Sequence, residues 1–102
     1  MQDLAAAGKP VFIDFTAAWC ITCQYNKRNA LAHPEVLADF AAKGVTLLRA
    51  DWTRRDSAIT TALAQLGRNG VPVYVLQAPG REPLVLSEIL SVQELRSALA
   101  GL

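Results

Sequence analysis

The sequence predicts a single α/β domain in which a mixed sheet of about four strands is flanked by helices. Strand-like and helical segments alternate along the chain, and the last two strands are separated only by a short turn. Alternation favours parallel pairing, whereas a hairpin adds an antiparallel pair. With 102 residues, 52% of them hydrophobic and 19% charged, the chain can close one hydrophobic core.

The first expected strand covers residues 10–16. Its four large apolar side chains in a short run are typical of a strand that is buried on both faces, and a single acid, Asp14, interrupts them. A short helix over residues 3–7 is expected to precede this strand.

A long helical segment is expected next, from Cys20 to about Lys43. Its apolar residues recur at helical spacing, but Pro34 predicts a kink or a break near His33. A lysine followed by Gly44 is a typical helix stop.

The second half of the chain is marked by caps and turns. Ser91 with Glu94 three residues later predicts a capping box at the start of the last helix, which Gly101 closes. The other expected elements are a strand over 45–50, a helix over 58–66 capped by Asp56 or Ser57, and strands over 71–76 and 84–86 joined by a Pro79-Gly80 turn.

Composition and charge exclude several classes of function. Ten Lys and Arg against nine Asp and Glu give a net charge of +1, too little for nucleic-acid binding by a basic face. One histidine and two cysteines are too few for a closed zinc site, so no metal is expected. No apolar run approaches the ~20 residues that span a bilayer, and no secretion signal is recognisable. We expect residues 1–102 to form one soluble domain, complete or cut from a larger protein.

The two cysteines carry the clearest chemical signal. Cys20 and Cys23 lie at the expected junction of the first strand and the following helix, where unpaired N–H groups favour a thiolate. Their spacing brings them within reach of a disulfide. We expect Cys20 to be the exposed nucleophile and Cys23 the resolving thiol. An inert disulfide, two buried thiols or half of a zinc site are the alternatives.

Asp14 is the second candidate, because burial of an unpaired acid raises its pKa. In one interpretation it lies at a sheet edge in contact with water. In the other it lies beneath Cys23 and exchanges the proton that disulfide chemistry moves.

The run VFIDFTAAWCITC over residues 11–23, followed about fifty residues later by Gly70-Val71-Pro72, resembles the thioredoxin superfamily over essentially the whole chain. The resemblance implies a thioredoxin fold with a redox-active Cys20–Cys23 disulfide and no organic cofactor. It implies that Asp14 is the buried acid, Trp19 the aromatic before the nucleophile, and Pro72 a cis-proline that faces the disulfide. The backbone of Val71 would then pair with an extended substrate.

Ile21-Thr22, between the cysteines, is neither the Gly-Pro of thioredoxin nor a histidine-containing pair, and the missing histidine points to a reductant. With Lys9-Pro10 and His33-Pro34, the motif resembles the C-terminal periplasmic domains of membrane thiol:disulfide interchange proteins. That branch implies a periplasmic, monomeric domain of an inner-membrane protein. It would pass electrons from a transmembrane dithiol to a periplasmic disulfide, for instance in cytochrome c biogenesis. A free-standing cytoplasmic reductase and a binding module with a structural disulfide are the alternatives.

The remaining side chains are assigned mainly to packing or solvent. Tyr25, Trp52 and Tyr74 are expected to be core contacts, and His33 to lie on the surface at the helix break. Arg49 either reaches towards Asp14 or lies exposed at a strand edge. Two charge pairs are expected to be solvated: Lys27-Arg28 and Arg54-Arg55.

Overall fold

A four-stranded mixed sheet organises residues 9–102, the part of the chain that the computed structural model describes. The short helix expected over residues 3–7 lies outside this part. The elements are, in chain order, β1 (Val11–Thr16), α2 (Ile21–Asn26), the π-helical turn η1 (Lys27–Leu31), α3 (Pro34–Ala42), β2 (Thr46–Asp51), α4 (Ser57–Gln65), β3 (Val73–Gln77), β4 (Leu84–Val85) and α5 (Val92–Ala100).

The strand order β2-β1-β3-β4 makes β1 an inner strand. It pairs parallel with β2 and antiparallel with β3, and β4 pairs antiparallel with β3, so the predicted mixed sheet is confirmed. In this register Asp14 stands between Arg49 on β2 and Tyr74 on β3. The interpretation that places Asp14 at a sheet edge is therefore wrong.

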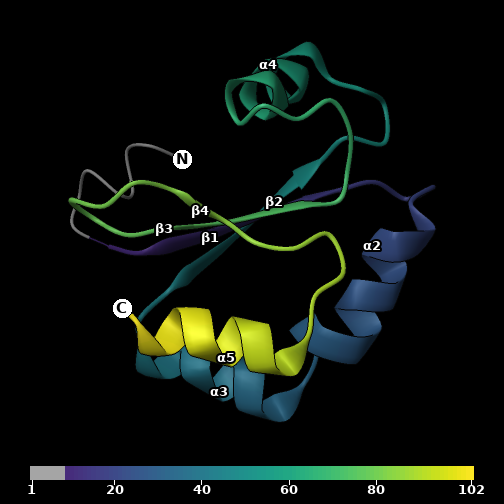
Figure 1. The fold of residues 1–102 in the computed structure, drawn as a ribbon. Coiled ribbons are helices and arrows are strands. Elements are labelled where there is room, and N and C mark those ends of the chain that lie inside the picture. The colour runs from purple at the N-terminus through teal and green to yellow at the C-terminus, as the bar shows by residue number, and fades with distance from the viewer. Residues whose placement is uncertain (1–8) are drawn as a thin grey trace.

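Helices cover both faces of the sheet, with α4 on one face and α3 with α5 on the other (Figure 1). Because successive side chains of a strand point to opposite faces, β1 supplies both cores, as predicted. Val11, Ile13 and Phe15 pack towards α4, whereas Phe12 packs against Phe40 of α3 with ring centroids 5.1 Å apart. Asp14 follows the same alternation as Phe12 and so belongs to the face that carries α2 and α3.

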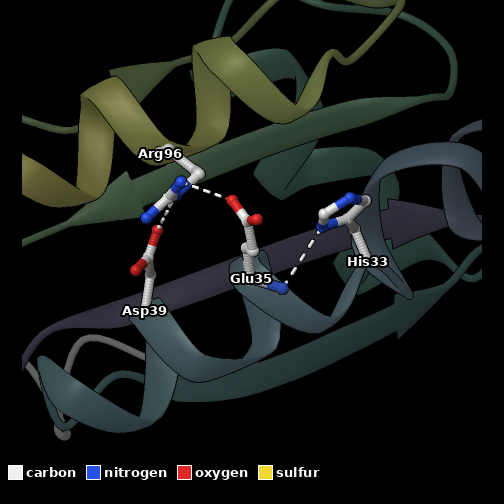
Figure 2. Close-up of polar contacts among 4 residues, drawn as sticks. All are labelled: His33, Glu35, Asp39 and Arg96. Atoms are coloured by element: carbon white, nitrogen blue, oxygen red, sulfur yellow. Dashed lines mark hydrogen bonds and ion pairs between the residues drawn. The ribbon is translucent and has the colours of Figure 1, made fainter.

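The predicted break in the long helical segment is confirmed at His33. Its Nδ1 accepts a hydrogen bond from the backbone N–H of Glu35, and Pro34 takes the first position of α3, where a missing N–H does no harm. The π-helical turn before the break was not predicted. Across the helices, Arg96 of α5 binds the carboxylates of Glu35 and Asp39 of α3 (Figure 2).

The predicted caps are confirmed with one correction. The carboxylate of Asp56 caps α4, and Ser91 Oγ accepts the N–H of Glu94 at the start of α5. The Glu94 carboxylate, however, accepts from the backbone and hydroxyl of Ser87 instead of completing a capping box, because the loop that precedes α5 brings Ser87 within reach. Among residues 9–102, no helix is long and apolar enough to cross a membrane.

Candidate redox site

A disulfide joins Cys20 and Cys23 at the start of α2. This helix is the element that follows β1 along the chain (Figure 1). Cys20 is the N-cap residue of the helix, with an extended backbone, and its Sγ accepts the N–H of Cys23 at 3.1 Å. The Cα atoms are 5.2 Å apart. The backbone N–H of Cys23 in the first turn therefore faces the sulfur of Cys20, which favours its thiolate once the disulfide opens.

The expected exposure of Cys20 needs correction. It is only 7% exposed, against 3% for Cys23, because both cysteines pack with Ala17 and Val71 in a small apolar cluster. Cys20 is still the more accessible of the two. In the oxidised protein, the expected nucleophile and the expected resolving thiol thus differ only slightly in exposure. The sulfur of Cys20 lies among apolar side chains.

Val71 and Pro72 come to the site from the segment before β3. The peptide bond between them is cis, as the resemblance implies, and the buried Pro72 leads directly into β3. Val71 packs against the cluster of Ala17, Cys20 and Cys23. The sheet thus brings a segment some fifty residues away in the sequence against the disulfide.

Trp19 precedes the disulfide and remains 48% exposed. Its Nε1 donates to the carbonyl of Thr53 at 3.1 Å, and the Thr53 hydroxyl accepts the N–H of Ala18 at 2.8 Å. The Trp19 ring lies 6.0 Å from that of Trp52, and the Arg55 guanidinium lies 5.3 Å and 5.2 Å from the two ring centroids. The β2–α4 loop therefore holds the residues that lead into Cys20.

The expectation that Arg55 belongs to a solvated pair is thus incomplete. Its cation stacks on two indole rings, an attraction between a positive charge and the ring quadrupole. Sequence reasoning could not find this contact, because it depends on a loop that approaches Trp19 from more than thirty residues away. Arg55 itself has a φ of 53°, and such a positive φ is uncommon for a residue other than glycine.

Asp14 and Cys23 line one cavity of about 160 Å³ next to the start of α2. One carboxylate oxygen of Asp14, Oδ1, is buried and has no hydrogen-bond partner among the described residues. Burial raises the pKa of this carboxyl, and the charges of Arg49 and Lys27 partly offset the rise. An acid with a raised pKa that shares a cavity with a thiol can exchange a proton with it, directly or through water.

Arg49 combines the two alternatives that the sequence left open. It lies on the edge strand β2 with an exposed side chain, and it is also the register partner of Asp14 and lines the same cavity. Lys27, expected only on a solvated face, is exposed and lines this cavity as well.

Asn26 is a residue of the site region that sequence reasoning missed. It is fully buried, donates from Nδ2 to the Tyr74 hydroxyl at 3.0 Å and to the Glu88 carbonyl at 2.7 Å, and accepts the N–H of Leu90 at 3.1 Å. Burial raises the pKa of Tyr74 to about 12, so its hydroxyl stays protonated. The only signal in the sequence is that Asn26 follows Cys23 by three residues, on the same helical face.

The apolar side chains of α2 next to the disulfide are exposed. Ile21 is 85% exposed and Tyr25 is 55% exposed, so the expectation that Tyr25 contacts the core is wrong. Residues two apart on a helix do not share a face, and Cys23 occupies the inner one. The predicted burial of Trp52 and Tyr74 is confirmed.

A family model described as thioredoxin-like matches residues 1–79. The thiol:disulfide interchange protein DsbD 1 of Pseudomonas aeruginosa is 39% identical over 80 residues, which cover 78% of this chain and 13% of that protein. DsbD of Cronobacter sakazakii is 36% identical over 78 residues, covering 76% and 13%. The chain thus spans about one eighth of the length of these relatives.

Among solved structures, the oxidised C-terminal domain of DsbD from Neisseria meningitidis superimposes with a TM-score of 0.81. The match covers 98% of this chain and 86% of that one at 22% sequence identity. It shows that the two chains share a fold.

Proposed function

The chain belongs to the thioredoxin-like family, and from this premise we propose that it is a thiol-disulfide oxidoreductase that works as a reductant in an electron relay. It would take electrons from a membrane-embedded dithiol and pass them to the disulfide of a periplasmic partner. One observation carries the proposal: the Cys20–Cys23 disulfide caps a helix while Cys23 shares a cavity with the half-buried Asp14.

The reaction is a sequence of two thiol–disulfide exchanges. In the reduced protein the Cys20 thiolate attacks one sulfur of the partner disulfide, which forms a mixed disulfide and releases one partner thiolate. Cys23 then gives its proton to Asp14 and attacks the Cys20 sulfur, which closes the Cys20–Cys23 disulfide and releases the second thiolate. The protein loses two electrons, the partner gains them, and the partner thiolates take up two protons. An upstream dithiol reverses these steps to reload the protein.

Two features favour a reductant over an oxidant. Ile21-Thr22 contains no histidine that would stabilise the Cys20 thiolate. A carboxylate at Asp14 opposes the ionisation of Cys23 in the shared cavity. Both features limit how far the thiolates are stabilised, and a dithiol with less stabilised thiolates gives up its electrons more readily.

The partners follow from the family chemistry. The named relatives are interchange proteins far longer than this chain, so we propose that the domain acts as a periplasmic part of such a membrane protein. Trp19, Ile21 and Val71 surround the disulfide and offer an apolar platform for another thiol–disulfide protein. Electrons travel as cysteine thiols, so the monomeric domain needs no organic cofactor and no metal.

The reduction potential tests this function against that of a structural disulfide. A relay disulfide should equilibrate with dithiothreitol or glutathione, whereas a structural one should resist reduction, with a potential below about −300 mV. Cys20→Ser should abolish reduction of a model disulfide. Cys23→Ser should instead accumulate mixed disulfides, and the double variant serves as the control for non-covalent capture. Transfer that survives Cys20→Ser would contradict the assignment.

A further inference from the structure

We propose that Lys27 is a positioning residue for the proton transfer: together with Arg49, its ammonium favours the ionised, proton-accepting form of Asp14 and so shifts the pH range in which Cys23 closes the disulfide. This inference rests on the proposed function and assigns a role to a side chain outside the cysteine motif.

The geometry places Lys27 at a boundary between two spaces. Asp14, Lys27 and Arg49 line the cavity of about 160 Å³ that also holds Cys23, and the same three line an apolar groove of about 520 Å³ beside α3 and β2. Lys27 and Arg49 are exposed, while Oδ1 of Asp14 is buried. The carboxyl and both cations therefore border the cavity that holds the thiol as well as the groove.

The helix fixes Lys27 in this place. Lys27 follows Cys23 by four residues, so both lie on one helical face. Its backbone N–H donates to the Cys23 carbonyl at the point where α2 passes into the π-helical turn η1. Arg28, the next residue, is also exposed but lines neither space, which makes it a matched control.

Besides the thiol, four charged or titratable groups line the cavity or pair with Asp14 in the sheet. Lys27 comes from η1, Arg49 and Asp51 from β2, and Tyr74 from β3. Tyr74 is neutral because burial raises its pKa to about 12. Hydrogen bonds from Thr53 lower the pKa of Asp51, so this carboxylate stays anionic near neutral pH.

Lys27 adds to the effect of Arg49 on the ionisation of Asp14. The positive charges of Arg49 and Lys27 both favour the Asp14 carboxylate against the cost of burial, and Arg49 has the larger effect of the two. In the closing step the Asp14 carboxylate takes the proton of Cys23, the Cys23 thiolate forms the bond to the Cys20 sulfur, and Asp14 then releases the proton to water in the groove. Without Lys27, a smaller share of Asp14 is ionised at a given pH.

The test follows the reaction of the reduced protein with the chromogenic disulfide dithiobis(nitrobenzoate). Attack by Cys20 releases the first thionitrobenzoate, and closure by Cys23 releases the second, so the second phase reports closure. Lys27→Met should move the pH midpoint of this phase upward and slow it about threefold at pH 6. Lys27→Glu should slow it about tenfold. Lys27→Arg should restore the wild-type profile, and Arg28→Met should leave it unchanged.

A second readout does not depend on turnover. The carboxyl carbon of Asp14, followed by NMR in the oxidised protein, should titrate at higher pH in Lys27→Met and higher still in Lys27→Glu. Unchanged titration in both variants, with a wild type that still releases both thionitrobenzoates, overturns the role of Lys27 and leaves the proposed function intact. A wild type that never releases the second one overturns the proposed function itself, and the role of Lys27 in closure with it.

Discussion

Two regions near the disulfide each contain a buried polar group, and these groups differ in whether they are hydrogen-bonded. At the end of α2, Asn26 is fully buried, and both ends of its amide are used in three hydrogen bonds to Tyr74, Glu88 and Leu90. In the cavity below Cys23, the Asp14 carboxyl keeps a buried oxygen with no partner among residues 9–102.

The difference separates stability from reactivity. A satisfied buried amide fixes the position of α2 against β3 and the loop before α5, and it has no proton to exchange. An unsatisfied buried carboxyl costs stability, but its pKa is raised and its proton is available to the neighbouring thiol. The site therefore needs both side chains. Asn26 holds the helix that carries the cysteines in place, and Asp14 exchanges a proton with Cys23.

The largest effect is expected from Asn26→Leu. The substitution removes the Asn26 partner of the buried Tyr74 hydroxyl, the buried N–H of Leu90 and the part-buried carbonyl of Glu88, so the free energy of unfolding should fall by about 3 kcal/mol. Urea denaturation measures it. Asn29→Ala, which removes an exposed bond to the Tyr25 carbonyl, is the matched control and should cost less than about 0.5 kcal/mol. Equal losses in both variants would contradict the anchoring role of Asn26.

Asp14→Asn should have the opposite sign. Removing the charge of a partly buried, unpartnered carboxylate should raise the free energy of unfolding at pH 7 by about 1 kcal/mol, while disulfide closure slows because the proton acceptor is gone. Chemical denaturation and the second thionitrobenzoate phase measure the two effects. If Asp14→Asn is less stable than the wild type and closes the disulfide equally fast, the proposed difference between Asp14 and Asn26 is wrong.

The pH dependence of stability sharpens the same comparison. Because the pKa of Asp14 is raised on folding, the folded state binds more protons above the unfolded pKa of 3.8, so the Asp14 contribution is present below that pKa and lost as the pH rises through the folded pKa. Asp51 has a lowered pKa and acts in reverse, with stability lost as the pH falls. The free energy of unfolding of the wild type and of each variant is measured against pH by chemical denaturation. The difference between wild type and Asp14→Asn and the difference between wild type and Asp51→Asn should change with pH in opposite directions.

A smaller effect is expected from Arg55→Met. The variant keeps a long apolar side chain but loses the cation over Trp19 and Trp52, an interaction of about 0.5–1 kcal/mol. We expect tryptophan fluorescence to change and the KM for a protein partner to rise about threefold, with kcat nearly constant. Arg54→Met, at the neighbouring exposed position, should change neither quantity. A fall in kcat alone would place Arg55 in the chemistry and not in the platform.

The smallest effect is expected from Arg96→Met. Arg96 binds two carboxylates, of Glu35 and Asp39 (Figure 2). Arg96 and Glu35 are exposed, and Asp39 is half-buried. Exposed ion pairs contribute little because water and salt screen them. The melting temperature should fall by no more than a few degrees, and less in high salt. A loss of stability as large as that of Asn26→Leu would show that burial does not determine how much a polar contact stabilises this protein.

Local chemistry in the sequence determined the elements and the reacting pair. Pro34 after His33 marked the helix break, Asp56 marked the start of α4, and an apolar run marked β1, because caps, prolines and periodicity act over a few residues. The spacing of Cys20 and Cys23 at a strand-to-helix junction predicted their disulfide for the same reason.

Only the tertiary structure decided which groups surround that pair. Sheet order placed Asp14 on an inner strand instead of an edge, and long-range packing brought Arg55 over Trp19, Lys27 into the cavity and Asn26 onto Tyr74. The energy of each of these contacts depends on burial and on partners from distant segments. A side chain's neighbours along the chain do not determine either quantity, so the sequence alone could not separate the solvated Arg28 from the Lys27 beside it.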